Sequence, residues 1–148
     1  MTEPSSIASE KKGKNSVPVD LANACRTCDA QCCRYIALEW DRPRSKREID
    51  HVRWFLLHEN VHVFIDPAGK WFVEFKTACR AIAPDGRCSI YEARPRICRE
   101  HGENGTEECE VVGEGSPYRV RFNSAADLER YLDDKGVDWR WKPRKKAR

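Results

Sequence analysis

Four cysteines within nine residues are the side chains best suited to chemistry in this sequence: Cys25, Cys28, Cys32 and Cys33. In a helix, the first three would stand at i, i+3 and i+7, with their sulfurs on one face. The fourth would lie about 100° further round on the same side. Apolar packing would be served as well by alanine, leucine or valine. Four thiols on one surface therefore indicate either a metal or a disulfide.

The other four cysteines are spread over the second half of the chain: Cys79, Cys88, Cys98 and Cys109. The segment 77–109 that holds them shows no regular hydrophobic period and is punctuated by proline and glycine. Such a long irregular run in a small domain is unusual unless something other than apolar packing orders it. We therefore expect metal ligands drawn from both segments, and all eight cysteines are candidates.

Zinc and iron are both compatible with these thiols. A structural Zn²⁺ takes four thiolates in a tetrahedron, so that eight cysteines would accommodate two ions. A [4Fe–4S] cluster also takes four cysteines, and the spacing does not distinguish the two. The side chains of adjacent residues diverge, so Cys32 and Cys33 are poorly suited to share one ion. One of them would bind a second metal or remain a free thiol.

Hydrophobic periodicity predicts the elements that hold the cysteines. Ser45 is a predicted N-cap, with Glu48 as its capping-box partner, for a helix from Lys46 to Glu59. Apolar residues alternate at 61–65 and again at 71–75, on either side of Pro67-Ala68-Gly69, which predicts a β-hairpin.

Shorter signals complete the predicted architecture. A short apolar segment from Tyr35 to Leu38 and an alternating one at 118–122 are typical of strands. Ser124 opens a second helix that Gly136 ends, and 137–141 is expected to pack back on the body. The predicted fold is α+β: a small single domain with short helices, a β-hairpin and an irregular cysteine-rich half.

Composition sets the domain organisation. The chain has 148 residues, which is one domain by length. Hydrophobic residues make up 40% and charged residues 34%, so part of the chain is not expected to pack. We expect a flexible basic leader at 1–20, a cysteine-cluster metal-binding domain at 21–137 and a basic C-terminal tail at 138–148.

The compartment is expected to be the cytoplasm. No apolar run has the length of a signal peptide or of a membrane span, so no membrane partner is expected. In a reducing cytoplasm, clustered cysteines are more often metal ligands than disulfides. Buried cysteines without a ligand are the remaining alternative.

The cysteine motifs resemble a known family. Cys25-x2-Cys28-x3-Cys32-Cys33, followed by the segment from Gly86 to Arg99 with its Cys-Ser-Ile-Tyr-Glu-x-Arg-Pro-x-x-Cys-Arg phrase, is similar to the YkgJ-type cysteine-cluster family. This family is also known as the zinc- or iron-chelating CxxCxxCC domain, and the resemblance extends from Cys25 to Cys109. Three residues separate Cys28 from the pair Cys32-Cys33, whereas the family motif is often written with two. Ten residues separate Cys98 from Cys109, which makes His101 an alternative ligand.

The resemblance implies a bound metal and does not fix a reaction. One branch of the family is called flagellin lysine methylases, and older descriptions call such proteins iron–sulfur oxidoreductases. We expect a metal-binding protein that chelates zinc or iron, with an iron–sulfur cluster as one form of the site. A metal-dependent redox or lysine-methylase-like enzyme is an alternative, although no acid, base or nucleophile can be named. A third interpretation is a structural metal site in a protein whose basic tail, with Trp139 and Trp141, binds RNA or a protein partner.

Overall fold

The computed structural model describes residues 31–103, 116 and 118–146. Its elements follow in the order η1 (Gln31–Cys33), β1 (Tyr35–Trp40), α2 (Lys46–Leu56), β2 (Val61–Ile65), β3 (Trp71–Lys76), η2 (Tyr91–Ala93), α3 (Arg96–Glu103), β4 (Val120–Phe122) and α4 (Ala125–Asp134).

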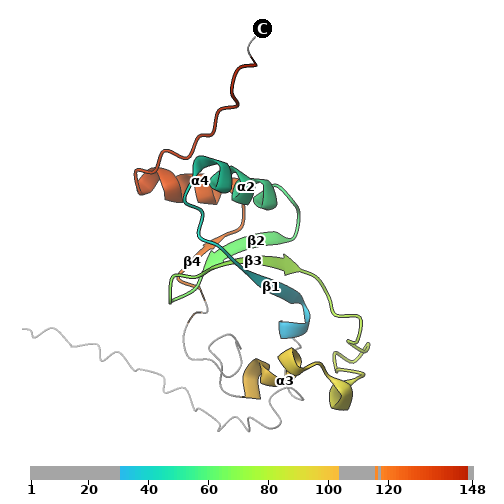
Figure 1. Ribbon diagram of the computed structural model, residues 1–148. Coiled ribbons are helices and arrows are strands. Elements are labelled where there is room, and N and C mark those ends of the chain that lie inside the picture. The colour runs from blue at the N-terminus through green and yellow to red at the C-terminus, as the bar shows by residue number, and fades with distance from the viewer. Residues whose placement is uncertain (1–30, 104–115, 117, 147–148) are drawn as a thin grey trace, which may run out of the picture.

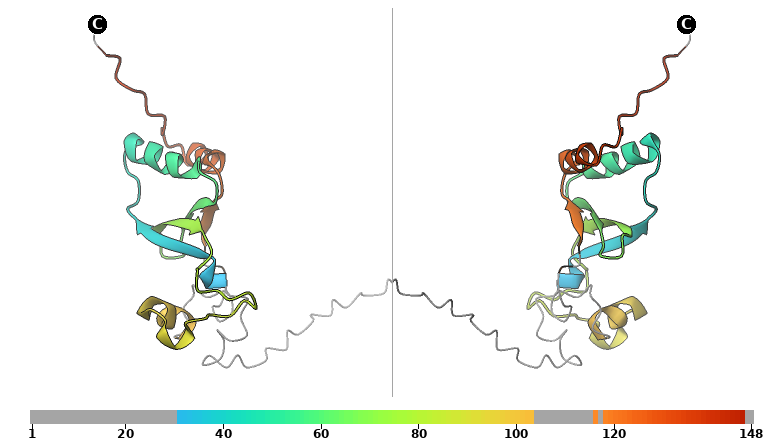
Figure 2. Two further views of the ribbon diagram at one scale, coloured as in Figure 1. Left: turned by 90° about the vertical axis from the view of Figure 1, so that its right-hand side faces the viewer. Right: turned by 90° about the vertical axis from the view of Figure 1, so that its left-hand side faces the viewer.

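The described strands form one antiparallel sheet in the order β1-β3-β2-β4. Helices α2 and α4 lie side by side over one face of this sheet (Figure 1). The cysteine-bearing elements η1 and α3 lie on the other side of the sheet from these helices (Figure 2). The α+β prediction is therefore confirmed.

Helix α2 begins where the capping signal predicts. The hydroxyl of Ser45 accepts a hydrogen bond from the backbone N–H of Glu48, and the Glu48 carboxylate accepts one from the N–H of Ser45. Ser124 and Asp127 form the same reciprocal pair at the start of α4. These bonds satisfy backbone donors that the first turn of a helix leaves without partners.

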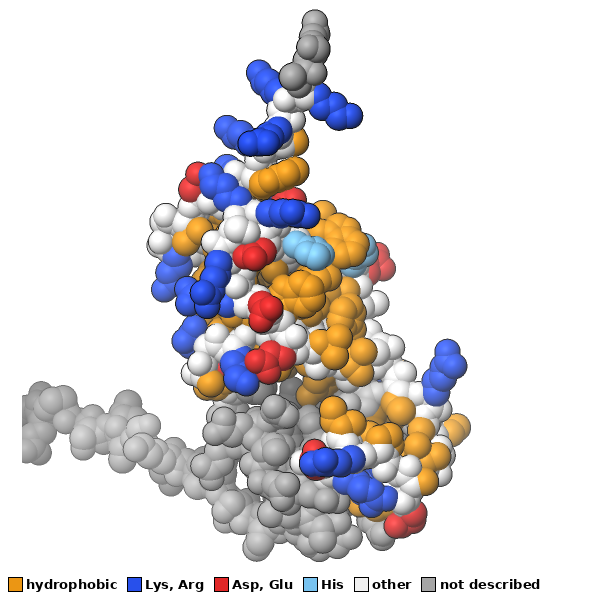
Figure 3. All heavy atoms as spheres, in the orientation of Figure 1, with side chains coloured by type: hydrophobic (Ala, Val, Ile, Leu, Met, Phe, Trp, Pro, Cys, Tyr) orange, Lys and Arg blue, Asp and Glu red, His pale blue; other side chains and the backbone are white. Residues whose placement is uncertain are grey.

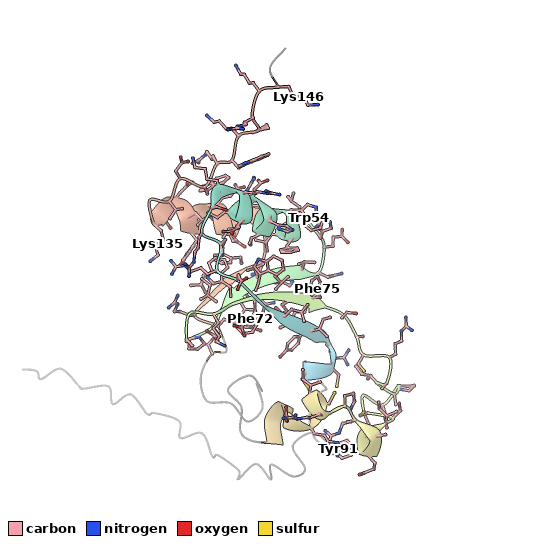
Figure 4. The ribbon with its side chains drawn as sticks, viewed as in Figure 1. Trp54, Phe72, Phe75, Tyr91, Lys135 and Lys146 are labelled. Carbon is pink, nitrogen blue, oxygen red and sulfur yellow. The ribbon has the colours of Figure 1, made fainter. Side chains whose placement is uncertain are left out.

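The predicted hairpin is strands β2 and β3. In their register, Val63 pairs with Val73 and Ile65 with Trp71, and all four side chains are buried beneath the two helices. Alternate residues of a strand point to opposite faces. Phe72 and Phe75 accordingly lie on opposite sides of β3 (Figure 4).

Of the interval 137–141, which the sequence predicted to pack back on the body, Trp139 is the residue that returns to the core. Trp139 is only 8% exposed, and its indole N–H donates a hydrogen bond of 2.8 Å to the carboxylate of Asp133. The guanidinium of Arg53 lies over the indole ring, 4.7 Å from its centroid. Trp139 therefore fixes the point from which the basic tail leaves the body.

The face of the sheet opposite the helices holds a buried charge. Glu74 is fully buried, and its two carboxylate oxygens lie 2.8 Å from Lys76 Nζ and 2.8 Å from Arg121 Nη2. His62, opposite Glu74 in the β2–β3 register, is half-buried. Burial lowers the pKa of His62, and the positive charge of Arg121 lowers it further. This face therefore combines an ion-paired carboxylate with an imidazole whose neutral form is favoured.

Candidate metal centre

Three segments carry the five described cysteines. Element η1 supplies Cys32 and Cys33, the chain after β3 supplies Cys79 and Cys88, and α3 supplies Cys98. The first two segments adjoin because β1 and β3 are paired, with Tyr35 opposite Lys76 at the end of the ladder. Strand pairing therefore brings cysteines from both halves of the sequence to one end of the sheet.

Backbone hydrogen bonds continue past the ladder into the cysteine segments. The N–H of Thr77 donates to the carbonyl of Arg34, with 2.9 Å between the two atoms. The N–H of Cys79 then donates to the carbonyl of Cys33 at 2.7 Å. The backbones at these two cysteines are thus held together by bonds that do not involve a metal.

The loop between Cys79 and Cys88 folds back on itself. The N–H of Gly86 donates to the carbonyl of Ala83 at 2.8 Å, and the N–H of Ala83 donates to the carbonyl of Arg87 at 2.7 Å. Gly86 has φ +82°, a left-handed conformation that other residues adopt at a cost. An isolated β-bridge then pairs Ile82 with Cys88. This turn returns Cys88 toward the chain next to Cys79.

Two arginines hold the segment between Cys88 and Cys98. Arg94 stacks on Tyr91, 3.8 Å from the ring centroid, and donates from Nε to the carbonyl of the same residue at 2.8 Å. Arg99 donates to the carbonyls of Glu92 and Arg94. Tyr91 is labelled at the lower end of the molecule in Figure 4. These two guanidinium groups position η2 against α3.

The electrostatics link one thiol of the pair to the other segments. Burial raises the pKa of the Cys33 thiol, a hydrogen bond with Cys32 acts in the opposite direction, and negative charge on Cys79, Cys88 and Cys98 raises it further. Cys33 therefore lies within electrostatic range of cysteines from both other segments. The raised pKa favours the neutral thiol of Cys33, and a bound metal cation would favour its thiolate by compensating the negative charge.

The donor set of the described residues fits a soft metal. The five described cysteines carry no disulfide, and thiolates suit Zn²⁺ and iron–sulfur clusters. Within the described ranges, no three cysteine, histidine or acidic side chains are already close enough to hold an ion. Backbone hydrogen bonding brings Cys33 and Cys79 together, and the described residues form no closed coordination shell.

Several predicted site residues lie outside the described residues. Cys25, Cys28 and Cys109 belong to this group, together with most of the helix proposed for 25–33. The described end of that segment, Gln31–Cys33, is a single 3₁₀ turn. His101 lies in α3, one turn after Cys98.

The sequence did not predict helix α3. The interval 77–109 was expected to lack regular structure, and the structure instead contains a helix at Arg96–Glu103. Pro95 precedes it, and the carbonyl of Pro95 accepts the N–H of Cys98 at 3.0 Å. A proline just before a helix was the signal that could have found it.

Comparisons with known proteins bear on the cysteine motifs. The family model CxxCxxCC, described as a putative zinc- or iron-chelating domain, matches residues 24–117. No curated protein and no solved structure matches the chain. None of the helices in the described part of the chain is long and apolar enough to cross a membrane. The matched interval covers most of the chain and includes all eight cysteines, and the chain therefore belongs to the CxxCxxCC family of zinc- or iron-chelating domains.

Proposed function

We propose that the cysteine segments form one thiolate metal centre, which joins η1, the chain after β3 and α3 into a folded unit. The observation that carries this proposal is the approach of Cys33 to Cys79 across the end of the β1–β3 ladder. Two thiol-bearing segments that lie far apart in sequence leave the sheet side by side. None of these cysteines belongs to the apolar core, which is formed by α2, α4 and the strands.

The residues that would hold the metal are Cys33, Cys79, Cys88 and Cys98. Cys25, Cys28, Cys32 and Cys109 are further candidates for the same centre or a second one. A bound Zn²⁺ would supply structural cross-linking, and an iron–sulfur cluster would supply electron transfer. The chain's own contribution is to position the thiols, through the turn at Gly86 and the arginine contacts around Tyr91.

Elemental analysis of anaerobically purified protein, with an absorbance spectrum alongside, tests the proposal. Zinc without colour indicates a structural centre. Iron with acid-labile sulfide and a brown colour indicates a cluster and a redox role, because charge transfer from sulfur to iron absorbs visible light, whereas d¹⁰ zinc does not. Protein that is well folded by circular dichroism and binds neither metal would overturn the proposal.

The proposed compartment is the cytoplasm. Free thiols persist where glutathione and thioredoxin keep them reduced, and the five described cysteines carry no disulfide. A fluorescent fusion expressed from the native locus, compared with a marker of each compartment, tests this assignment. Exclusive export of the fusion would contradict it.

We propose a second, independent function for the tail: binding of single-stranded RNA. The start of the tail is anchored by Trp139, and beside it lies a hollow of about 380 Å³ lined by Lys46, Asp138, Arg140, Trp141 and Lys142. The tail continues away from the two helices as far as Lys146, which Figure 4 labels. Cations along an extended backbone match phosphates, and an exposed indole stacks on bases.

Salt titrations of RNA binding test this second function. Fluorescence anisotropy with a labelled oligouridylate is measured for the wild type and for a variant with Lys142, Arg144, Lys145 and Lys146 changed to Gln. The slope of log K against log salt is expected to become shallower by about 3, since each neutralised phosphate on a single strand contributes about −0.7. Lys135→Gln, at the C-cap of α4, is the control for loss of a lysine outside the tail. Equal slopes for all three proteins would contradict RNA binding by the tail and would leave the metal proposal unaffected.

A further inference from the structure

Strand β1 has one partner strand in the described part of the chain. Its inner edge pairs with β3, and no described strand lies along its outer edge. Monomeric proteins commonly protect such an edge with lysine, proline or a bulge. The six residues of β1 contain no lysine or proline and only one charged residue, Glu39.

The helix-facing side of β1 is apolar and exposed. Ile36 is 53% exposed and Leu38 is 56% exposed, and Trp40 continues the same row. Trp54 on α2 and Leu57 at the C-cap of this helix are also exposed. In Figure 3, hydrophobic side chains form a continuous area on this face, beside the histidines. Contiguous apolar surface of this kind is typical of a protein interface.

Aromatic contacts fix the upper end of this area. The Trp40 ring meets Phe55 edge to face, with 5.0 Å between the centroids, and meets His51 at 5.6 Å. His51 in turn lies 5.6 Å from the Trp54 ring. The side chain of Trp40 is therefore held against α2, so that little side-chain freedom would be lost on association.

The ladder shows which backbone groups of β1 point outward. The N–H of Thr77 bonds the carbonyl of Arg34, its directly opposite residue, so even-numbered residues of β1 face β3. Consequently the N–H and C=O groups of Ala37 and Glu39 point to the outer edge. These groups are the donors and acceptors that an added antiparallel strand would bond.

We propose that this edge binds a second copy of the chain, with β1 pairing antiparallel to its own copy about a two-fold axis at Leu38. In this register Ala37 bonds the partner's Glu39, and Glu39 bonds the partner's Ala37. Leu38 faces the partner's Leu38, and Ile36 faces the partner's Trp40, in pairs without hydrogen bonds, where side chains approach most closely. The two four-stranded sheets become one sheet of eight strands.

Charge and parity select this occupant and this register. Directly opposite residues must lie on the same face of the sheet. The two-fold axis must therefore pass through a residue of β1 and not between two residues. An axis at Glu39 would place two carboxylates opposite each other, which is unfavourable. An axis at Ala37 would set Arg34 against the partner's Trp40 and leave the apolar row incomplete. The axis at Leu38 pairs all three exposed apolar residues with apolar residues of the partner, and Glu39 keeps its ion pair with Lys70 at 3.3 Å.

Charge exchange at the axis tests the proposal. Sedimentation velocity is measured from about 1 µM to about 1 mM in reducing buffer, so that disulfide-linked species are excluded. Wild type is expected to dimerise. Leu38→Lys and Leu38→Glu, each placing like charges opposite each other, are expected to weaken self-association roughly tenfold or more. A mixture of the two variants is expected to regain dimers, because Lys then faces Glu.

Val137→Lys is the matched control, because Val137 is also apolar and 40% exposed and lies after α4, away from β1. It is expected to dimerise like the wild type. A wild type that remains monomeric throughout the range would overturn the proposal. A dimer that survives Leu38→Lys, or mixed variants that stay monomeric, would do the same by placing the contact elsewhere. Circular dichroism confirms that each variant is folded.

Discussion

The backbone N–H of Cys79 lies 2.7 Å from the carbonyl oxygen of Cys33, to which it donates a hydrogen bond. The bond stands directly beyond the β1–β3 ladder, so strand pairing determines the distance between these two cysteines. The cysteine-bearing segments at Cys33 and Cys79 are thereby an extension of the sheet. Substitutions in the sheet, in the turn at Gly86 and at the cysteines are each expected to affect metal binding, and separate controls distinguish their effects.

Cys88→Ser is expected to lower the molar ratio of bound metal, because a serine hydroxyl is a much weaker ligand than a thiolate for zinc or iron. Inductively coupled plasma mass spectrometry on purified protein measures this ratio. Ile90→Ser, an exposed position in the same loop, introduces the same side chain without removing a thiol and is expected to keep the wild-type ratio. Equal metal content in wild type and Cys88→Ser would exclude Cys88 as a ligand.

Gly86→Ala is expected to weaken metal binding through the backbone. Gly86 has φ +82° with open space where a Cβ would lie, so the cost is conformational, about 1–2 kcal/mol. Gly136 has φ +67° and equally open space, at the end of α4 and away from the cysteines. Gly136→Ala is therefore expected to lower the free energy of unfolding by a similar amount with unchanged metal affinity.

Competition with a chromophoric chelator measures the affinity of both variants, and urea denaturation measures their stability. The prediction concerns the difference between the two proteins. If Gly136→Ala loses as much metal affinity as Gly86→Ala, the turn has no specific role in positioning Cys88.

Acid is expected to weaken the start of α2. The backbone N–H groups of Arg44 and Ser45 donate to the Glu48 carboxylate and hold its pKa below the ordinary value of 4.5. A pKa that is lower in the folded state gives stability that is present above pH 4.5 and is lost as the pH falls through the folded pKa. Glu48→Gln removes this contribution, so its stability is expected to depend less steeply on pH.

Urea denaturation followed by far-ultraviolet circular dichroism, at a series of pH values from about 5 to about 3, measures the difference. Asp134→Asn, at an exposed position on α4, serves as the control for loss of a carboxylate. Parallel pH profiles for wild type and Glu48→Gln would contradict the prediction.

Trp139→Ala is expected to destabilise the protein by about 3 kcal/mol, because a large buried ring is removed together with its hydrogen bond to Asp133. Trp141 is 48% exposed, and Trp141→Ala is expected to change the free energy of unfolding by no more than about 0.5 kcal/mol. Thermal and urea denaturation measure both values. Similar losses for the two variants would mean that the tail is not anchored by Trp139.

Local signals predicted the helix-covered half of the molecule. Ser45 and Ser124 identify the starts of two helices because a hydroxyl and a carboxylate three residues apart satisfy the first backbone donors. Alternation around Gly69 identifies the β2–β3 hairpin because both strands bury the same face. Helix α2 ends at Leu56 rather than at the predicted Glu59, because Leu57 caps it and Asn60 takes a left-handed φ of 60° before β2.

Contacts between distant segments were beyond local reasoning. Nothing in the sequence of β1 indicates that it pairs with β3, and this pairing is what brings Cys33 to Cys79. Glu74 stands in a strand as a charged residue, and only the strands beside it reveal that Lys76 and Arg121 neutralise it. The sequence named the cysteines of both segments as candidate ligands, and the strand pairing that brings Cys33 to Cys79 was not foreseen.

The pairing of β1 with β3 has a consequence for chain entropy. Cys33 and Cys79 are 46 positions apart, and closing a free loop of that length costs about 3 kcal/mol. The sheet meets this cost during its own folding, so an ion that binds both cysteines does not meet it again. A mutation that weakens the β1–β3 pairing is therefore expected to lower metal affinity as well, even when it lies far from any sulfur.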